Sequence, residues 1–286
     1  MTAVDWARAA GIEGLPVRRD FFEDAPERVA PRLLGMVLAH RTAEGVVAGR
    51  IVEVEAYLGP HNQPPDPAAH AYRGPTPRNQ VLFGLAGHAY VYAIYGRYFC
   101  MNISCEPEGR AGCVLLRALE PLVGLEEMAR RRGLALPPIP AKGAEMDGAP
   151  GTRLSQVTES RPGAPEICET FWRERFLRSH PLRDEACAMD GAPGGHSEGR
   201  LKKAGWTARD LTAGPSRLCQ ALGVTRAGEN GLDLRDADSP LRVLDDGWRP
   251  EEIAVTARIG IKEAVDWPLR FAVAGNACVS GPKRLR

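Results

Sequence analysis

The sequence lacks the features of a disulfide-stabilised, secreted or membrane-spanning protein. Its 7 cysteines are an odd number without a Cys-x-x-Cys pair, which fits a reducing compartment better than a disulfide framework. No apolar run is long enough to cross a bilayer, and the N-terminus lacks a basic segment followed by an apolar one. We therefore expect a cytoplasmic protein that does not associate with membranes.

The chain also has no excess of charge of one sign. Its 37 basic and 36 acidic residues give a formal net charge of +1, which predicts no strong overall attraction to nucleic acid. Any affinity for DNA must come from a locally basic face. The hydrophobic content of 44% is that of an ordinary globular protein, so the chain as a whole is neither fibrous nor disordered.

Aromatic residues are scarce, at 6%, but they are concentrated in one segment. Five of them surround a single Gly-Arg turn: Tyr90, Tyr92, Tyr95, Tyr98 and Phe99. Two strands joined at this turn predict a β-hairpin with Tyr95 near its tip. So many flat rings in one place indicate a flat partner.

Acidic side chains occur in a strand where apolar ones would have been sufficient. The period-two pattern from Val46 to Leu58 predicts a strand whose two faces alternate. We expect its apolar residues to face the core and Glu53, Glu55 and Tyr57 to lie on a working face. Arg117 interrupts another apolar run. A flat partner, a carboxylate and an arginine together suggest chemistry on a nucleobase.

The remaining pattern predicts the fold class α+β. Short helices are expected within 21–39 and over 122–132. We expect a strand over 113–119, ending at Pro121, and a helix that opens at the Gly-Pro turn at 214–215. Because regular βαβ spacing is absent, we expect a single mixed domain around an antiparallel sheet, with flanking short helices and the protruding hairpin.

The ends and the middle of the chain differ from this pattern. Residues 1–16 are expected to be a leader, and 17–286 a single domain with a long insertion at 134–209 that is rich in Pro, Gly and charged residues. The hexapeptide MDGAPG occurs in it at 146–151 and 189–194. The repeat is either a duplicated contact loop or, as we favour, a chance echo in a low-complexity stretch.

The insertion also contains side chains that could bind a metal. Cys168, His180, Cys187 and His196 have spacings that match no compact pair of zinc ligands. We therefore expect no metal, and the absence of four clustered cysteines argues against an iron–sulfur protein.

Seven segments resemble, in order along the chain, the alkyladenine (3-methyladenine) DNA glycosylase family. They are RIVEVEAYLG (50–59), AAH (68–70), TPRN (76–79), the aromatic segment 90–104, CVLLRALEP (113–121), GPSRLCQAL (214–222) and ARIG (257–260). Each alone is a weak signal, whereas the ordered set is specific and covers most of the chain outside the leader and the insertion. The resemblance implies a curved sheet and a monomeric hydrolase that removes damaged purines from duplex DNA without metal or organic cofactor.

The resemblance further implies the catalytic residues. Glu55 matches the carboxylate that activates water, Arg117 the arginine beside it, and the backbone carbonyl of Ile259 a third partner of the water. Breaking the bond between sugar and base builds positive charge on the sugar, which an ionised carboxylate stabilises. No lysine in these motifs matches a nucleophile, so strand cleavage is not expected.

Residues that bind the base and the duplex are implied in the same way. Tyr57, His70 and Tyr92 match the residues that sandwich an extruded base, and Asn102 matches the one that excludes the amino group of guanine. Tyr95 matches the side chain that fills the gap left in the duplex.

Five further positions are expected to contact the DNA backbone: Thr76, Arg78, Arg97, Ser216 and Arg217. Arg97 stands where members of the family often carry methionine. We therefore expect an added phosphate contact at the hairpin tip.

Simpler interpretations of the same residues compete with these roles. Glu53 has no matched role and is either structural or a partner of the catalytic groups. Arg117 would pair with Glu120 at a strand end, and Asn102 would be a turn-facing amide. For the whole protein, the alternatives are a non-catalytic binder of distorted DNA and a hydrolase of free nucleosides. The paired carboxylate and arginine argue against the first, and a tyrosine at a hairpin tip argues against the second.

Overall fold

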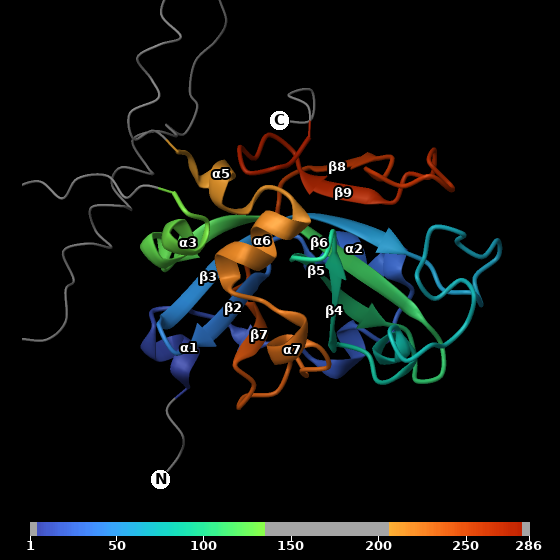
Figure 1. Ribbon diagram of the computed structural model, residues 1–286, viewed down its shortest axis with the longest axis horizontal. Helices are drawn as coiled ribbons and strands as arrows, with labels where there is room; N and C mark the ends of the chain where they lie inside the picture. The colour runs from blue at the N-terminus through green and yellow to red at the C-terminus, as the bar shows by residue number, and fades with distance from the viewer. Residues whose placement is uncertain (1–4, 135–205, 282–286) are drawn as a thin grey trace, which may run out of the picture. The chain divides into compact units, whose positions relative to one another are not determined.

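The chain folds around a curled antiparallel sheet with short helices beside it, as the α+β prediction requires (Figure 1). The computed structural model describes residues 5–134 and 206–281. Within them the strands are β1 Leu15–Pro16, β2 Val37–Thr42, β3 Gly45–Tyr57, β4 Ala89–Ile94, β5 Tyr98–Cys105, β6 Gly112–Val123, β7 Leu241–Asp245, β8 Ile253–Thr256 and β9 Arg270–Val273. The helices are α1 Trp6–Ala9, α2 Pro26–Leu33, α3 Leu125–Arg131, α5 Ala208–Thr212, α6 Pro215–Leu222 and α7 Arg226–Glu229, with 3-10 turns at Arg19–Phe21 and Gln80–Phe83.

Strand β3 is central to the sheet, whose order is β1-β7-β2-β3-β6-β5-β4, with β9 joining β3 to β8. On one side β3 pairs with β6, and on the other with β2 at its beginning and β9 at its end. Register shifts between Ile51 and Val54 mark a bulge in the pairing with β6. Bulges are common next to active sites because they redirect side chains.

The two faces of β3 are both buried, which corrects the expectation of an open working face. Val52, Val54 and Ala56 are fully buried in the core, as the alternation predicts. Glu53 and Glu55 are equally buried, at 0% exposure, because residues near the C-terminal end of the described chain bond to both carboxylates.

Two predicted boundaries were also wrong. The helical spacing expected over 21–39 ends with α2 at Leu33, and β2 begins at Val37, because a short apolar run fits a buried strand as well as a helix. The strand expected to end at Pro121 continues to Val123. Pro121 is tolerated there because it faces a register shift in β3.

Helices α3, α5 and α6 lie next to one another, and α6 packs on β5 and β6 (Figure 1). The Gly-Pro turn opens α6 as predicted, with Pro215 in its first turn. Within the expected leader, α1 and β1 pack on the sheet, and Trp6 is buried in a core cluster. Except for Leu134 and 206–209, the expected insertion lies outside the described residues, as do both copies of its hexapeptide.

Candidate active site

Glu55 lies near the end of β3 and faces three donor groups. Its Oε1 accepts a hydrogen bond from the backbone N–H of Ile259 at 2.7 Å and lies 3.1 Å from Nη1 of Arg117. The hydroxyl of Tyr57 donates to Oε2 at 3.0 Å. Burial and the adjacent Glu55 raise the pKa of Tyr57, so its phenol remains a donor at neutral pH. A deprotonated carboxylate, which only accepts, satisfies all three partners.

Arg117 on β6 bridges two carboxylates. Its Nε donates to Oε1 of Glu53 at 2.8 Å, while its Nη1 faces Glu55. Burial lowers the pKa of Arg117, but the two carboxylates raise it by more than burial lowers it, so the guanidinium stays charged. The simpler pairing with Glu120 is wrong, because Glu120 instead accepts from the amide of Asn276 at 3.1 Å.

The three residues expected to hold a base are linked by contacts: Tyr57 bonds to Glu55, Tyr57 and Tyr92 pack against one buried cluster, and Tyr92 contacts His70. The rings of His70 and Tyr92 are in edge contact, with centroids 4.6 Å apart. Since a base between two rings requires about 7 Å, or two contacts of about 3.5 Å, these rings must separate for a base to lie between them. Burial, and then Arg78, lower the pKa of His70, so its imidazole is neutral at pH 7. Its Nδ1 lies 2.9 Å from the hydroxyl of Tyr90.

Several residues that position this cluster were not predicted. Arg258 and Asp66 form a fully buried ion pair with two contacts, at 2.5 and 3.0 Å, which joins the loop after β3 to the segment after β8. The guanidinium of Arg258 also lies 4.6 Å from the ring centroid of Tyr57. Asn79 donates to the backbone carbonyl of His70 at 2.8 Å. The compact TPRN motif could have indicated Asn79, whereas no local pattern links positions as distant as 66 and 258.

Asn102 lies in strand β5, so the interpretation as a turn-facing amide is wrong. Its side chain is buried, donating to the carbonyl of Tyr90 at 3.3 Å and accepting from the thiol of Cys113 at 3.7 Å. These contacts fix the amide near the aromatic cluster. Its role toward a base stays a prediction.

The hairpin of β4 and β5 carries Tyr95 at its tip, as predicted. The strands pair up to Ile94 and Tyr98, which leaves a three-residue turn. Tyr95 is 90% exposed and adopts a φ of 49°, and Gly96 follows with a φ of 75°. An exposed aromatic ring therefore projects from the sheet.

The five predicted backbone contacts fall in two places. Thr76 and Arg78 lie in the loop after β3, where they line a cavity of about 230 Å³. Arg97 on the hairpin and Ser216 in the first turn of α6 line a different cavity, and Arg217 is exposed beside Ser216. Within the described part of the chain, the guanidiniums of Arg78, Arg97 and Arg217 form no ion pair with a carboxylate.

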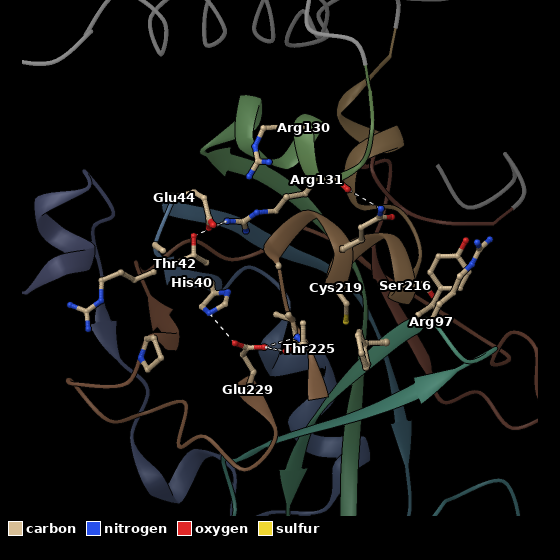
Figure 2. Close-up of a pocket in the computed structure, with 18 residues that line it drawn as sticks. His40, Thr42, Glu44, Arg97, Arg130, Arg131, Ser216, Cys219, Thr225 and Glu229 are labelled. Carbon is tan, nitrogen blue, oxygen red and sulfur yellow. Dashed lines mark hydrogen bonds and ion pairs between the residues drawn. The ribbon is translucent and has the colours of Figure 1, made fainter. Parts of the chain in front are cut away.

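The second cavity has a volume of about 900 Å³ and is lined by residues of α6, the β2–β3 turn and the hairpin (Figure 2). On its wall Nε2 of His40 lies 3.6 Å from Oε1 of Glu229, and Nδ1 of His40 lies 2.9 Å from the carbonyl of Leu222. Burial lowers the pKa of His40, so this ring is neutral at pH 7. Of the predicted residues only Arg97 and Ser216 line this cavity, which is therefore distinct from the site around Glu55.

In the part of the chain that the structure describes, no three His, Cys, Asp or Glu side chains are grouped to hold a metal ion. Cys168, His180, Cys187 and His196 lie outside that part. Among the described helices, none combines the length and the apolar character needed to cross a membrane.

The fold and the site define an α+β protein that buries a carboxylate–arginine pair beside a cluster of aromatic rings. The chain belongs to the methylpurine-DNA glycosylase family, whose model matches residues 20–155 and 187–277.

Relatives of similar length accompany this match. A protein of Koribacter versatilis (strain Ellin345) is 38% identical over 270 residues, which cover 94% of this chain and 95% of the relative. A protein of Methanoculleus marisnigri (strain ATCC 35101 / DSM 1498 / JR1) is also 38% identical, over 91% of this chain and 96% of its own. Both carry the name 3-methyladenine DNA glycosylase, assigned provisionally.

Proposed function

We propose that this protein is a monofunctional DNA glycosylase of base excision repair, acting as a monomer on duplex DNA. It flips alkylated or deaminated purines, of the 3-methyladenine, 7-methylguanine, hypoxanthine and ethenoadenine class, out of the duplex and hydrolyses the N-glycosidic bond. Family membership and the names of the relatives support the general activity. The observation that carries the mechanism is the buried Glu55 carboxylate, held by Arg117, Tyr57 and Ile259.

In this mechanism Glu55 takes a proton from the attacking water and stabilises the positive charge that develops on the sugar. The carboxylate is closed to solvent in the free protein, whereas Tyr57 is partly exposed and Ile259 is 38% exposed. We place the approach of the water at these two residues, because they are the partners of Glu55 that reach solvent. The backbone of Ile259, whose N–H already bonds to Glu55, is suited to hold the water through its carbonyl.

The aromatic cluster binds the extruded base. Tyr57, His70 and Tyr92 supply the rings between which it stacks. A neutral His70 adds no positive charge, so a cationic alkylated base is not repelled there. Asn102 excludes the amino group of an intact guanine, since its amide is fixed by two hydrogen bonds and cannot retreat.

The duplex is held open by Tyr95 and bound through its phosphates. An exposed ring at a hairpin tip is suited to fill the space of a flipped nucleotide. Arg78, Arg97 and Arg217 provide cations that no carboxylate in residues 5–134 and 206–281 neutralises, and Thr76 and Ser216 add hydroxyl donors.

The decisive experiment measures release of free base from duplexes that each carry one hypoxanthine, one ethenoadenine or one alkylated purine. We expect release by the wild-type protein and a loss of at least about 100-fold in Glu55→Gln, because a neutral amide cannot act as a base. Binding of damaged duplex by both proteins without any release would instead favour the non-catalytic binder.

A further inference from the structure

Glu53, which precedes Glu55 by two residues on the same face of β3, accepts four hydrogen bonds. Its Oε1 accepts hydrogen bonds at 2.8 Å from Nε of Arg117, Nε of Arg270 and the hydroxyl of Ser280. Its Oε2 accepts from the backbone N–H of Ser280 at 2.6 Å. Burial raises the pKa of Glu53, but Arg117 and Arg270 together lower it by more than burial raises it. The net pKa is lowered, so the carboxylate is ionised at neutral pH.

The result is a buried group of four charges that sum to zero. Glu53 and Glu55 have fully buried side chains, and the guanidiniums of Arg117 and Arg270 are 8% and 2% exposed. Buried ion pairs are weak sources of stability, because the loss of hydration offsets their attraction and apolar side chains of similar volume often perform better. A second carboxylate and a second arginine beside the first pair therefore call for an explanation other than stability.

The geometry divides the donors of Arg117 between the two carboxylates. Nε bonds to Glu53, Nη2 lies 3.4 Å from the hydroxyl of Ser280, and only Nη1 faces Glu55. Without Glu53, the guanidinium could turn and engage Glu55 with two donors, which is the arrangement arginine prefers with a carboxylate. A Glu55 carboxylate held by two donors of Arg117 would accept a proton from water less readily.

Arg270, which also bonds to Glu53, contacts the backbone segment that leads to Ile259. Its Nη1 donates to the hydroxyl of Thr256 at 3.0 Å, at the end of β8 and three residues before Ile259. Its Nη2 donates to the carbonyl of Ser280 at 2.9 Å. Glu53 thus orients, directly or through Arg270, two of the three groups that bond to Glu55.

We propose that Glu53 is a positioning residue for catalysis, which holds Arg117 in a single-donor contact with Glu55 and, through Arg270, fixes the strand end that leads to Ile259. The inference rests on the proposed function. In this proposal Glu53 affects the rate of bond cleavage and does not affect the binding of DNA or base.

The test compares single-turnover base release and damaged-duplex affinity across pH for the wild-type protein, Glu53→Gln and Glu53→Asp. In Glu53→Gln we expect the maximal rate to fall at least about tenfold, the affinity to stay within about twofold, and the acid limb of the pH–rate profile to move to lower pH. That movement follows because one negative charge is lost next to Glu55 and Arg117 turns toward it. In Glu53→Asp the charge is kept, so the limb stays in place while the shorter side chain lowers the rate.

If Glu53→Gln folds poorly, the double variant Glu53→Gln/Arg270→Gln keeps the charge balance, and we expect the same loss of rate with unchanged affinity. A wild-type rate and profile in Glu53→Gln would overturn the inference. So would a parallel loss of rate, affinity and thermal stability in every variant, because a purely structural role produces that result. Failure of the wild-type protein to release any base would instead refute the proposed function.

Discussion

Tyr95 combines an unfavourable backbone conformation with almost complete exposure. A φ of 49° is uncommon for a residue with a large side chain, and a ring that is 90% exposed gains almost no burial to offset the cost. Neither the stability of the hairpin nor core packing explains a tyrosine here. A function that uses the ring outside the protein does explain it.

We therefore expect Tyr95→Gly to change stability and activity in opposite directions. Glycine adopts positive φ freely, so the unfolding free energy should rise by about 0.5–1 kcal/mol. Base release from damaged duplex should fall by roughly 10- to 100-fold, because unstacking costs a few kcal/mol that the ring no longer repays. Urea unfolding and single-turnover assays measure the two effects.

Tyr95→Ala is the matched control, since it removes the ring and keeps a Cβ at positive φ. We expect the same loss of activity without the gain in stability. A Tyr95→Gly protein that releases base at the wild-type rate would show that the ring does not act as a wedge.

At the scale of elements, the loop after β3 and the segment after β8 depend on one buried ion pair. Asp66→Asn leaves Arg258 with a neutral partner in a fully buried position. We expect a loss of about 3–5 kcal/mol in the free energy of unfolding, together with slower base release because Tyr57 packs against Arg258. Chemical denaturation of the two proteins at neutral pH checks the first effect.

The exposed pair of Arg18 and Asp20 provides the comparison, with side chains 85% and 66% exposed. Asp20→Asn should leave the unfolding midpoint unchanged, because solvent screens this pair. Equal effects of the two substitutions would contradict the structural importance of Asp66.

The elements that sequence predicts well are those with local signals. Period-two alternation identified β3, the Gly-Arg turn identified the hairpin, and the Gly-Pro turn identified the start of α6. The beginning of β2 at Val37 was missed because a short apolar run has no distinguishing period. Burial of Glu53 was missed for another reason: its partners Arg270 and Ser280 come from the far end of the chain.

In the candidate site, too, residues within a motif could be predicted and their distant partners could not. The resemblance indicated Glu55 and Arg117 by position, and the structure brings them to 3.1 Å. It assigned no role to Asp66, Arg258 or Arg270, since buried charge partners are chosen by three-dimensional proximity and leave no local pattern. Residues that position a site are therefore harder to predict from one sequence than residues with a motif.

For the whole molecule, a net charge of +1 conflicts with DNA binding only if charge is averaged over the surface. Many of the described acidic residues form ion pairs with arginines, as Asp245 does with Arg249 at 2.6 Å. Arg97 and Arg217 have no carboxylate partner in the described ranges, so their charge is available to phosphates. Arg132, which follows α3, donates to the side chain of Gln220 in α6, so it adds a guanidinium near Arg217; burial, and then Arg217, lower the pKa of Arg132.

Binding should therefore depend on salt through a few identifiable arginines. Each phosphate neutralised contributes about −0.9 to the slope of log K against log salt concentration. We expect Arg217→Ala to make that slope less steep by about 1 and to weaken damaged and undamaged duplexes alike. Arg249→Ala, which removes an arginine already paired with Asp245, should leave the slope unchanged. Fluorescence anisotropy over a series of salt concentrations distinguishes the two, and an equal change in both variants would mean that the overall charge of the protein, and not a local basic face, attracts the duplex.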